Sequence, residues 1–215
     1  MYKKKSLFIV FEGIEGSGKS YLSKKLYLRL KKKRLPIVHT REPGGTVVAE
    51  NIRKVILEDY FRKKSKKMFD KYTDTLLYLA SRNEHILNKI KPALFKKNIV
   101  ICDRFIDSTI AYQVYGKKVD KKFIDFIHKY ILYNVKPDIT FVLKVKINKA
   151  ILRLKKRKKK NRYDKFSKGF YIKAQKSFLK IAKKNKSSHV VLDSSFDNRE
   201  LEKQIFNIVL KKLNK

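Results

Sequence analysis

Eight consecutive residues near the start of the chain have the types and spacing needed to hold phosphate groups. They read Gly13-Ile14-Glu15-Gly16-Ser17-Gly18-Lys19-Ser20, the pattern G-x-x-x-x-G-K-S, and follow the apolar run 7–11. Such glycines let backbone N–H groups converge on phosphate oxygens, Lys19 can reach the β and γ phosphates, and Ser20 can ligate Mg²⁺. A chance match is disfavoured because a strand precedes the loop and an amphipathic helix follows it. The segment predicts a loop that binds a nucleoside triphosphate.

Arginine is the next residue type that carries chemical information, because its planar guanidinium recognises phosphates and base edges through paired hydrogen bonds. Seven of the eleven arginines fall in motif segments and are the candidates for such recognition: Arg41, Arg53, Arg82, Arg104, Arg153, Arg157 and Arg162. The other four are expected at solvated helix or loop positions: Arg29, Arg34, Arg62 and Arg199.

The net charge of +37 ordinarily suggests binding to nucleic acid or to an anionic membrane. Lysine accounts for 45 of the 56 basic residues, and the lysines are spread along the whole chain. The composition is typical of A/T-rich codon usage. No recognition helix, zinc finger or aromatic RNA-binding pattern accompanies the charge. We therefore expect no specific nucleic-acid partner, only weak, salt-sensitive adsorption to polyanions.

The length of 215 residues favours one α/β domain over residues 1–215. The one cysteine, Cys102, lies in an apolar run and is expected in the core of a protein from a reducing compartment. The basic start of the chain superficially resembles a secretory signal, but the apolar run after it ends at Glu12, and no other segment approaches a membrane span. The chain is expected to be cytoplasmic, with no membrane partner.

Strands and helices are predicted to alternate along the chain. Strands are expected over 7–11, 36–40, 99–102, 139–145 and 190–192. Helices are expected over 21–30, 48–57, 70–94, 108–114, 121–132, 150–157, 167–184 and 199–213, with Pro92 helping to end the third. This alternation predicts a five-stranded parallel sheet with helices on both faces and a ligand site at the carboxyl ends of the strands. The segment 59–69 is expected to be a Lys-rich connection, and the basic run 155–162 to belong to a short lid over about 153–165.

Several motifs occur together, and their order and spacing carry a resemblance. They are residues 11–20, the segment Arg41-Glu42-Pro43-Gly44-Gly45-Thr46, Asp103-Arg104-Phe105 followed by Ser108 and Ala111-Tyr112-Gln113, the segment 76–82, and Pro137-Asp138-Ile139-Thr140. Over about residues 7–192 the chain resembles the bacterial thymidylate kinases. The resemblance implies a P-loop kinase fold and transfer of the γ-phosphoryl group of ATP to dTMP, giving dTDP and ADP in dTTP synthesis. It also implies Mg²⁺ as cofactor and a homodimer.

Around the transferred phosphoryl group, the resemblance implies that Lys19, a Mg²⁺ held by Ser20 and the loop amides bind the donor. Arg104 is expected to bridge donor and acceptor phosphates, unless it only forms a salt bridge at a strand end. Asp103 is expected to hold Mg²⁺ through water or to orient Arg104, and could instead be a structural partner. Glu15 is expected at the acceptor sugar or a metal-bound water, and could instead be a solvated carboxylate.

At the acceptor, the resemblance places Arg41 and Arg53 near the phosphate, although Arg53 could be an exposed helix arginine. Glu42 is expected to shape the pocket, and the Glu42–Pro43 peptide bond could be cis or trans. Tyr112, with Gln113, is expected against the deoxyribose, where its ring leaves little room for a 2′-hydroxyl. A core aromatic is the alternative for Tyr112.

Base recognition is expected from a helix that places Tyr78 and Arg82 four residues apart on one face. Tyr78 is expected to stack on thymine and Arg82 to donate a hydrogen bond to a base oxygen, with an ordinary helix-face pair as the alternative. Ser108 and Thr109 are expected to face the base, or to cap a helix.

In the last third of the chain the resemblance weakens, because Lys144 and Asn161 stand where the family often has acidic residues. Arg153, Arg157 and Arg162 remain, and one of them is expected to supply the charge of an arginine finger, since the phosphate loop lacks an arginine. Which of the three acts stays open. Another nucleoside monophosphate kinase is the nearest rival, and the chain has no N-K-x-D segment typical of a GTPase.

Overall fold

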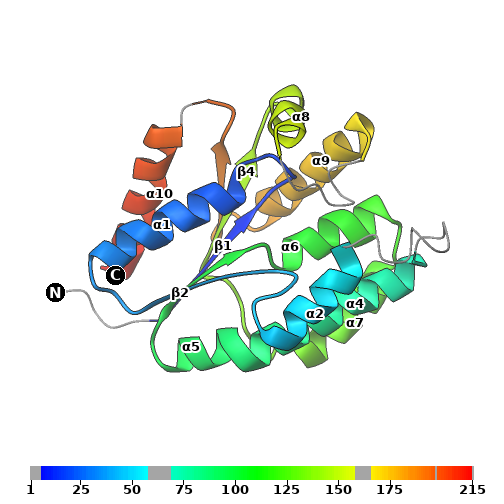
Figure 1. The fold of residues 1–215 in the computed structure, drawn as a ribbon, viewed down its shortest axis with the longest axis horizontal. Helices are drawn as coiled ribbons and strands as arrows, with labels where there is room; N and C mark the ends of the chain where they lie inside the picture. Colours follow the sequence, from blue (N-terminus) through cyan, green and yellow to red (C-terminus); the bar gives the residue numbers. More distant parts are fainter. Residues whose placement is uncertain (1–5, 58–68, 158–165, 197, 215) are drawn as a thin grey trace.

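A computed structural model describes residues 6–57, 69–157, 166–196 and 198–214, and its centre is one parallel sheet (Figure 1). The strands are β1 (Leu7–Glu12), β2 (Ile37–Arg41), β3 (Ile99–Asp103), β4 (Ile139–Lys144) and β5 (His189–Asp193). Their order in the sheet is β2-β3-β1-β4-β5, and all neighbouring pairs are parallel. The carboxyl ends of all five strands therefore lie at the same edge, and the predicted α/β fold is confirmed.

The helices have the following bounds: α1 (Lys19–Lys32), α2 (Val47–Leu57), α4 (Lys71–His85), α5 (Lys91–Phe95), α6 (Ile106–Thr109), α7 (Lys121–Ile131), α8 (Ile147–Lys155), α9 (Lys168–Lys184) and α10 (Asn198–Leu213). Two π-helical segments, η1 (Ile86–Ile90) and η2 (Ile110–Gly116), lie between them. Side-chain caps mark three of the starts: Asp70 accepts hydrogen bonds from the first turn of α4, Asp120 accepts one from that of α7, and Ser167 accepts one from that of α9.

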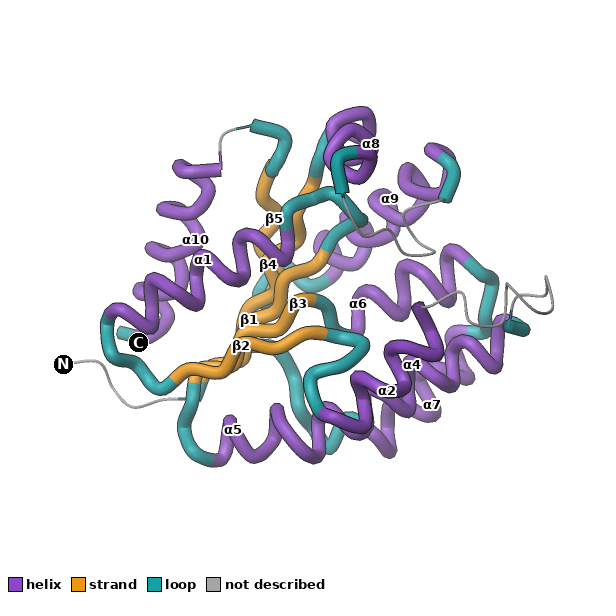
Figure 2. The backbone as a smooth tube through the Cα atoms, viewed as in Figure 1, coloured by secondary structure: helices purple, strands orange, loops and turns teal. Residues whose placement is uncertain are grey.

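The central strand β1 is buried on both faces, as its unbroken apolar run requires in a parallel sheet. Leu7, Ile9 and Phe11 belong to a cluster with apolar residues of α1 and α10. Phe8 and Val10 belong to another with Ile86 and Ile90 of η1. Figure 2 shows α1 and α10 on one side of the sheet and α5 on the other. The two cores hold the carboxyl end of β1, where the phosphate loop begins.

The predicted helix over 70–94 is wrong in one respect, because it is not a single α-helix that Pro92 helps to end. It passes from α4 through η1 into α5, and Pro92 lies in the first turn of α5. In a regular α-helix, proline has no N–H to donate and its ring crowds the carbonyl four residues earlier. The wider π turn before Pro92 relaxes both the need for that donor and the crowding. The predicted helix over 108–114 is likewise part α-helix and part π-helix.

Cys102 is buried, as predicted for a core residue. Most of the connection 59–69 and of the lid over 153–165, including Arg162, lies outside the described residues. Within the described ranges, no helix is long and apolar enough to cross a membrane. The single-domain organisation and the cytoplasmic location stay predictions.

Candidate active site

The phosphate loop runs from the carboxyl end of β1 to the start of α1, as its sequence predicts. Gly16 and Gly18 have φ angles of 75° and 91°, in the left-handed region that glycine tolerates. A Cβ on Gly16 would lie 2.5 Å from the carbonyl oxygen of Ala150, so this position also has no room for a side chain. Lys19 donates a hydrogen bond from Nζ to the carbonyl of Ile14, at 2.7 Å. Burial, assisted by the nearby Arg104, lowers the pKa of Lys19 from 10.5 to about 8.

Arg104, at the carboxyl end of β3, connects the phosphate loop with α6. Its Nη2 donates to Glu15 Oε1 at 2.7 Å, and its Nη1 donates to the carbonyl of Gly13 at 3.1 Å and to Ser108 Oγ at 2.9 Å. The other oxygen of Glu15 accepts a hydrogen bond from the Tyr112 hydroxyl at 2.7 Å. Burial acts to raise the pKa of Glu15, but Arg104 and Lys19 together hold it below 4.5. Glu15 is therefore ionised and fixes the direction of the guanidinium.

Ser20 and Asp103 face each other from α1 and β3 and form the candidate metal position. The Ser20 hydroxyl donates a hydrogen bond to Asp103 Oδ2. Asp103 Oδ1 is buried, and it has no hydrogen-bond partner among the described residues. A hydroxyl and an unpaired carboxylate oxygen are hard ligands of the kind that Mg²⁺ prefers. Glu15, predicted at the acceptor sugar or at a metal-bound water, has both carboxylate oxygens engaged by Arg104 and Tyr112.

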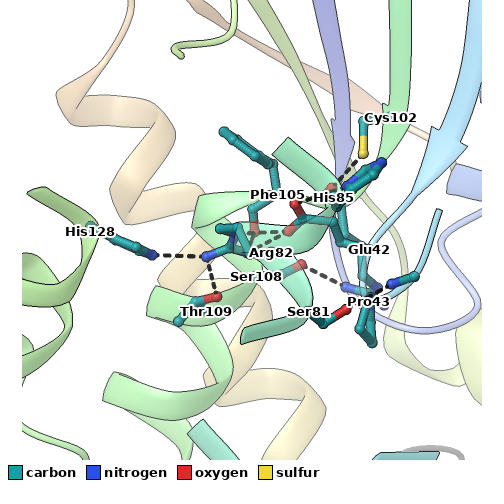
Figure 3. Close-up of polar contacts among 12 residues, drawn as sticks. Glu42, Pro43, Ser81, Arg82, His85, Cys102, Phe105, Ser108, Thr109 and His128 are labelled. Carbon is teal, nitrogen blue, oxygen red and sulfur yellow. Dashed lines mark hydrogen bonds and ion pairs between the residues drawn. The ribbon is translucent and has the colours of Figure 1, made fainter. Parts of the chain in front are cut away.

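A buried polar network surrounds Arg82 of α4 (Figure 3). Its Nε and Nη2 donate to Glu42 Oε2 at 2.8 and 2.7 Å, and Nη2 also donates to the carbonyl of Phe105 at 2.9 Å. Its Nη1 donates to Thr109 Oγ1 and to His128 Nε2, both at 2.9 Å. A guanidinium has five N–H donors, so every donor of Arg82 has a partner. The side chain is an ion-pair centre rather than a solvated helix arginine.

Glu42 extends this network toward the sheet. Its Oε1 lies 3.3 Å from His85 Nδ1, and His85 Nε2 lies 2.6 Å from Thr40 Oγ1. Burial acts to raise the pKa of Glu42, but Arg82 and His85 together lower it below its ordinary 4.5. The Glu42–Pro43 peptide bond, left open by the sequence, is cis.

A cavity of about 570 Å³ joins the phosphate loop to this network. Its lining includes these predicted site residues: Glu15, Gly16, Gly18, Lys19, Ser20, Arg41, Glu42, Arg53, Tyr78, Arg82, Asp103, Arg104, Ser108, Thr109, Tyr112, Gln113, Arg153 and Arg157. Three other predicted residues, Gly13, Ile14 and Ser17, belong to the phosphate loop but not to the lining. The structure thus brings together the predicted residues that it describes.

Two arginines on the wall are held by neighbouring groups of the β2–α2 region. Arg41 donates from Nε and Nη2 to the two oxygens of Glu50, at 3.2 and 2.9 Å. Arg53 donates from Nη1 to the carbonyl of Pro43 at 2.6 Å, and its Nε lies 4.0 Å from Glu50. Arg53 is therefore anchored to the pocket rather than extended into solvent.

On the side of the cavity formed by α8, Arg153 donates from Nη1 to the carbonyl of Gly16 at 3.1 Å and from Nη2 to that of Ser194 at 3.0 Å. It therefore docks α8 on the phosphate loop. The Nε2 of Gln113 is buried and has no hydrogen-bond partner within the described ranges, which leaves it available to a ligand. The Tyr112 ring stacks on Phe170 with centroids 5.8 Å apart.

Sequence reasoning missed three side chains of the site: Glu12, His85 and His128. Glu12 accepts hydrogen bonds from the backbone N–H groups of Phe105 and Ser108 and from Ser108 Oγ, at 2.8, 3.1 and 2.6 Å, and so fixes the start of α6. For Glu12 the signal that could have found it was an acidic residue at the end of an otherwise apolar strand. For His128 the signal was its place four residues after Ile124 on the apolar face of a predicted helix.

Comparisons with known proteins agree with one another. A family model described as thymidylate kinase matches residues 11–205. A thymidylate kinase of Mycoplasma capricolum is 39% identical over 209 residues, which cover 96% of each chain. One of Ehrlichia chaffeensis is 42% identical over 192 residues, which cover 88% of this chain and 89% of that protein. The crystal structure of thymidylate kinase from Ehrlichia chaffeensis matches with a TM-score of 0.74 and 34% identity, over 95% of this chain and 99% of that chain.

Proposed function

Because this chain belongs to the thymidylate kinase family, we propose that it transfers the γ-phosphoryl group of ATP to dTMP, giving dTDP and ADP in dTTP synthesis. The observation that best supports this reaction is the cavity that joins the phosphate loop to Tyr78, Arg82 and Tyr112. Transfer between two nucleotides requires both to be held in line, with their negative charge neutralised. The resemblance identified from the motifs is confirmed at the level of the family.

At the donor end, we propose that Lys19 and the loop amides bind the β and γ phosphates of ATP. Phosphate oxygens replace the Ile14 carbonyl as the acceptor for Lys19. Mg²⁺, held by Ser20 and by the unpaired Oδ1 of Asp103, would neutralise charge on the same phosphates. Arg104 reaches between the two nucleotides, with Glu15 holding its guanidinium in place.

At the acceptor end, Arg41 and Arg53 contact the phosphate of dTMP, and Tyr112 with Gln113 lies against the deoxyribose. Tyr78 stacks on thymine. Arg82 donates to a base oxygen, and Ser108 and Thr109 stand beside the base. These assignments are supported by the fact that all these side chains line the same cavity.

The lid supplies the remaining positive charge. Arg157 lines the cavity, Arg153 docks α8 on the phosphate loop, and Arg162 lies outside the described residues. We propose that one of the three stabilises the charge that develops during transfer, since the loop itself lacks an arginine. Its replacement by Ala is expected to lower kcat more than it raises KM, which single variants at the three positions would reveal.

We also propose a homodimer formed through the face of α2, α4 and α7. Exposed apolar side chains gather on these helices: Val48 and Val55, Leu76, and Phe126 and Tyr130. The two aromatic rings are 55% and 65% exposed, and an exposed apolar patch of this kind marks an interaction surface. A second copy would cover this apolar surface. Sedimentation equilibrium is expected to give a dimer for the wild type and a monomer for Phe126→Glu.

The reaction is tested by coupling ADP release to each of a set of nucleoside monophosphates: dTMP, dUMP, dCMP, dAMP and dGMP. The highest kcat/KM is expected with dTMP, and activity is expected to require Mg²⁺. A purine nucleotide as the best acceptor, or no transfer to dTMP, would contradict the proposal.

A further inference from the structure

Recognition of a base by Arg82 poses a hydrogen-bonding problem, because its guanidinium has no N–H to spare. All five donors have acceptors in the protein: Glu42, the Phe105 carbonyl, Thr109 and His128. A base oxygen that takes a hydrogen bond from Arg82 must therefore replace one of these acceptors.

The cavity indicates which acceptor is replaced. Thr109 lines the cavity, whereas His128 does not and is 6% exposed. Glu42 and Phe105 also line the cavity, but both accept from the Nη2 end of the guanidinium, where Glu42 is the charge partner of Arg82 in a buried pair, and breaking that pair is costly. Exchange of the neutral Thr109 hydroxyl costs least, because that hydroxyl can turn toward the polar edge of the incoming base.

Once Thr109 has been exchanged, the Nη1 end of Arg82 depends on His128. Figure 3 shows His128 and Glu42 on opposite sides of the guanidinium. Glu42 holds Nε and Nη2 through a single oxygen, and His128 holds Nη1 at 2.9 Å. We propose that His128 is a positioning residue for base recognition, which fixes the Arg82 guanidinium from behind while the base accepts the Nη1–H now given to Thr109. The proposal rests on the thymidylate kinase reaction proposed above.

The chemical state of His128 suits this role. Burial, together with the charge of Arg82, lowers its pKa from 6.5 to about 3, against the opposite effect of Glu42. The ring is therefore neutral at ordinary pH, and because Arg82 can only donate, Nε2 accepts and the proton sits on Nδ1. A neutral acceptor gives Arg82 its remaining hydrogen-bond partner without competing with Glu42 for the positive charge of the guanidinium.

The test compares His128→Phe, which keeps a ring but removes the acceptor, with His128→Gln, whose amide oxygen can accept. The phenylalanine variant is expected to raise KM for dTMP roughly tenfold, because a buried donor loses its partner. It should also lower the ratio of kcat/KM for dTMP to kcat/KM for dCMP, and it should leave KM for ATP unchanged. The glutamine variant should restore both quantities to within a few fold of wild type, as the conservative replacement of an acceptor.

Ile124→Ala is the matched control, because Ile124 is fully buried on the same helix α7 but has no polar contact with Arg82. It should destabilise the protein and leave the dTMP:dCMP ratio intact. If His128→Phe does not fold, His128→Leu takes its place in the same comparison.

Two results would overturn the role of His128. One is that His128→Phe has the wild-type KM for dTMP and the wild-type ratio of kcat/KM for dTMP to that for dCMP. The other is that Ile124→Ala lowers this ratio as much as His128→Phe does, which would assign the effect to a loosened helix. A wild type that does not phosphorylate dTMP would instead remove the proposed function, and this inference with it.

Discussion

The two ends of the cavity are built in opposite ways. The phosphate end consists of eight consecutive residues, 13–20, in which glycine backbone and one lysine provide the contacts. At the base end, Glu42, Arg82, Thr109 and His128 come from four separate parts of the chain, and side chains provide the contacts. A phosphate site can be local because backbone N–H groups recognise any phosphate. Discrimination between bases requires donors held rigidly in place, which is the role that we propose for the Arg82 network.

The two ends of the cavity also differ in how their positive charges are paired. Lys19 donates to a backbone carbonyl, a neutral partner that a phosphate can replace. Arg82 is matched by the carboxylate of Glu42 at 2.7 Å in a buried pair. The phosphate end can therefore give its charge to a ligand, whereas at the base end we infer a single exchangeable hydrogen bond, the one from Arg82 to Thr109.

Lys19→Ala tests the phosphate end and has the largest expected effect. Turnover should fall about a hundredfold to a thousandfold, because the charge of Lys19 acts on phosphate oxygens during transfer. The fold should survive, since the side chain bonds only to a loop carbonyl. Steady-state kinetics measure the turnover and a thermal melt measures the stability of the fold, with Lys31→Ala at an exposed position of α1 as control. Normal turnover in Lys19→Ala would contradict the assignment of the loop.

Arg82→Ala tests the base end. Most of the dTMP activity should be lost, and discrimination of about 1–3 kcal/mol against dCMP should go with it, because thymine offers an acceptor at O4 where cytosine has an amino donor. Glu42 would also lose its arginine partner in a buried ion pair, so the protein should be less stable. Kinetics with both nucleotides measure the selectivity, and Arg199→Ala on the exposed side of α10 is the control. Retained selectivity would mean that thymine is read elsewhere, with Ser108 and Thr109 the next candidates.

A smaller effect concerns the pH dependence of stability. The pKa of His128 falls from 6.5 to about 3 on folding, so the unfolded chain binds the proton more readily. Below pH 6.5 the free energy of unfolding of the wild type should fall relative to that of His128→Gln by up to about 1.4 kcal/mol per pH unit. Above pH 6.5 the free energies of the two proteins should depend on pH in the same way. Denaturant titrations of both proteins at pH 4.5 to 8 measure this. Parallel curves throughout would show that His128 is not held neutral by its surroundings.

The contrast between the two ends also explains what could be predicted from the sequence. The phosphate loop was predicted in full because its function depends on residues adjacent in the chain. The strands were predicted to within one or two residues because β1 and β3 are continuous apolar runs. The π turn before Pro92 was not, because a helical pattern of apolar residues does not resolve one widened turn.

At the base end, the sequence predicted roles for Tyr78 and Arg82, which both line the cavity, but not what holds Arg82. His128 is 46 residues further along the chain, and no motif connects the two. Ser108 illustrates the same limit: it was predicted to face the base, and its hydroxyl lies on the cavity wall but donates to Glu12 and accepts from Arg104. Partners in a tertiary network are set by packing, which a local pattern does not contain.

The most direct test of the division between the two ends is the ratio of kcat/KM for dTMP to that for dCMP, measured in wild type, Lys19→Ala and Arg82→Ala under identical conditions. Lys19→Ala should be slow with both nucleotides and keep the wild-type ratio, because its contact is with phosphate alone. Arg82→Ala should narrow the ratio about tenfold, within the range expected for one base contact. If Lys19→Ala narrowed the ratio as much as Arg82→Ala, or if neither changed it, base recognition would not reside in the Arg82 network.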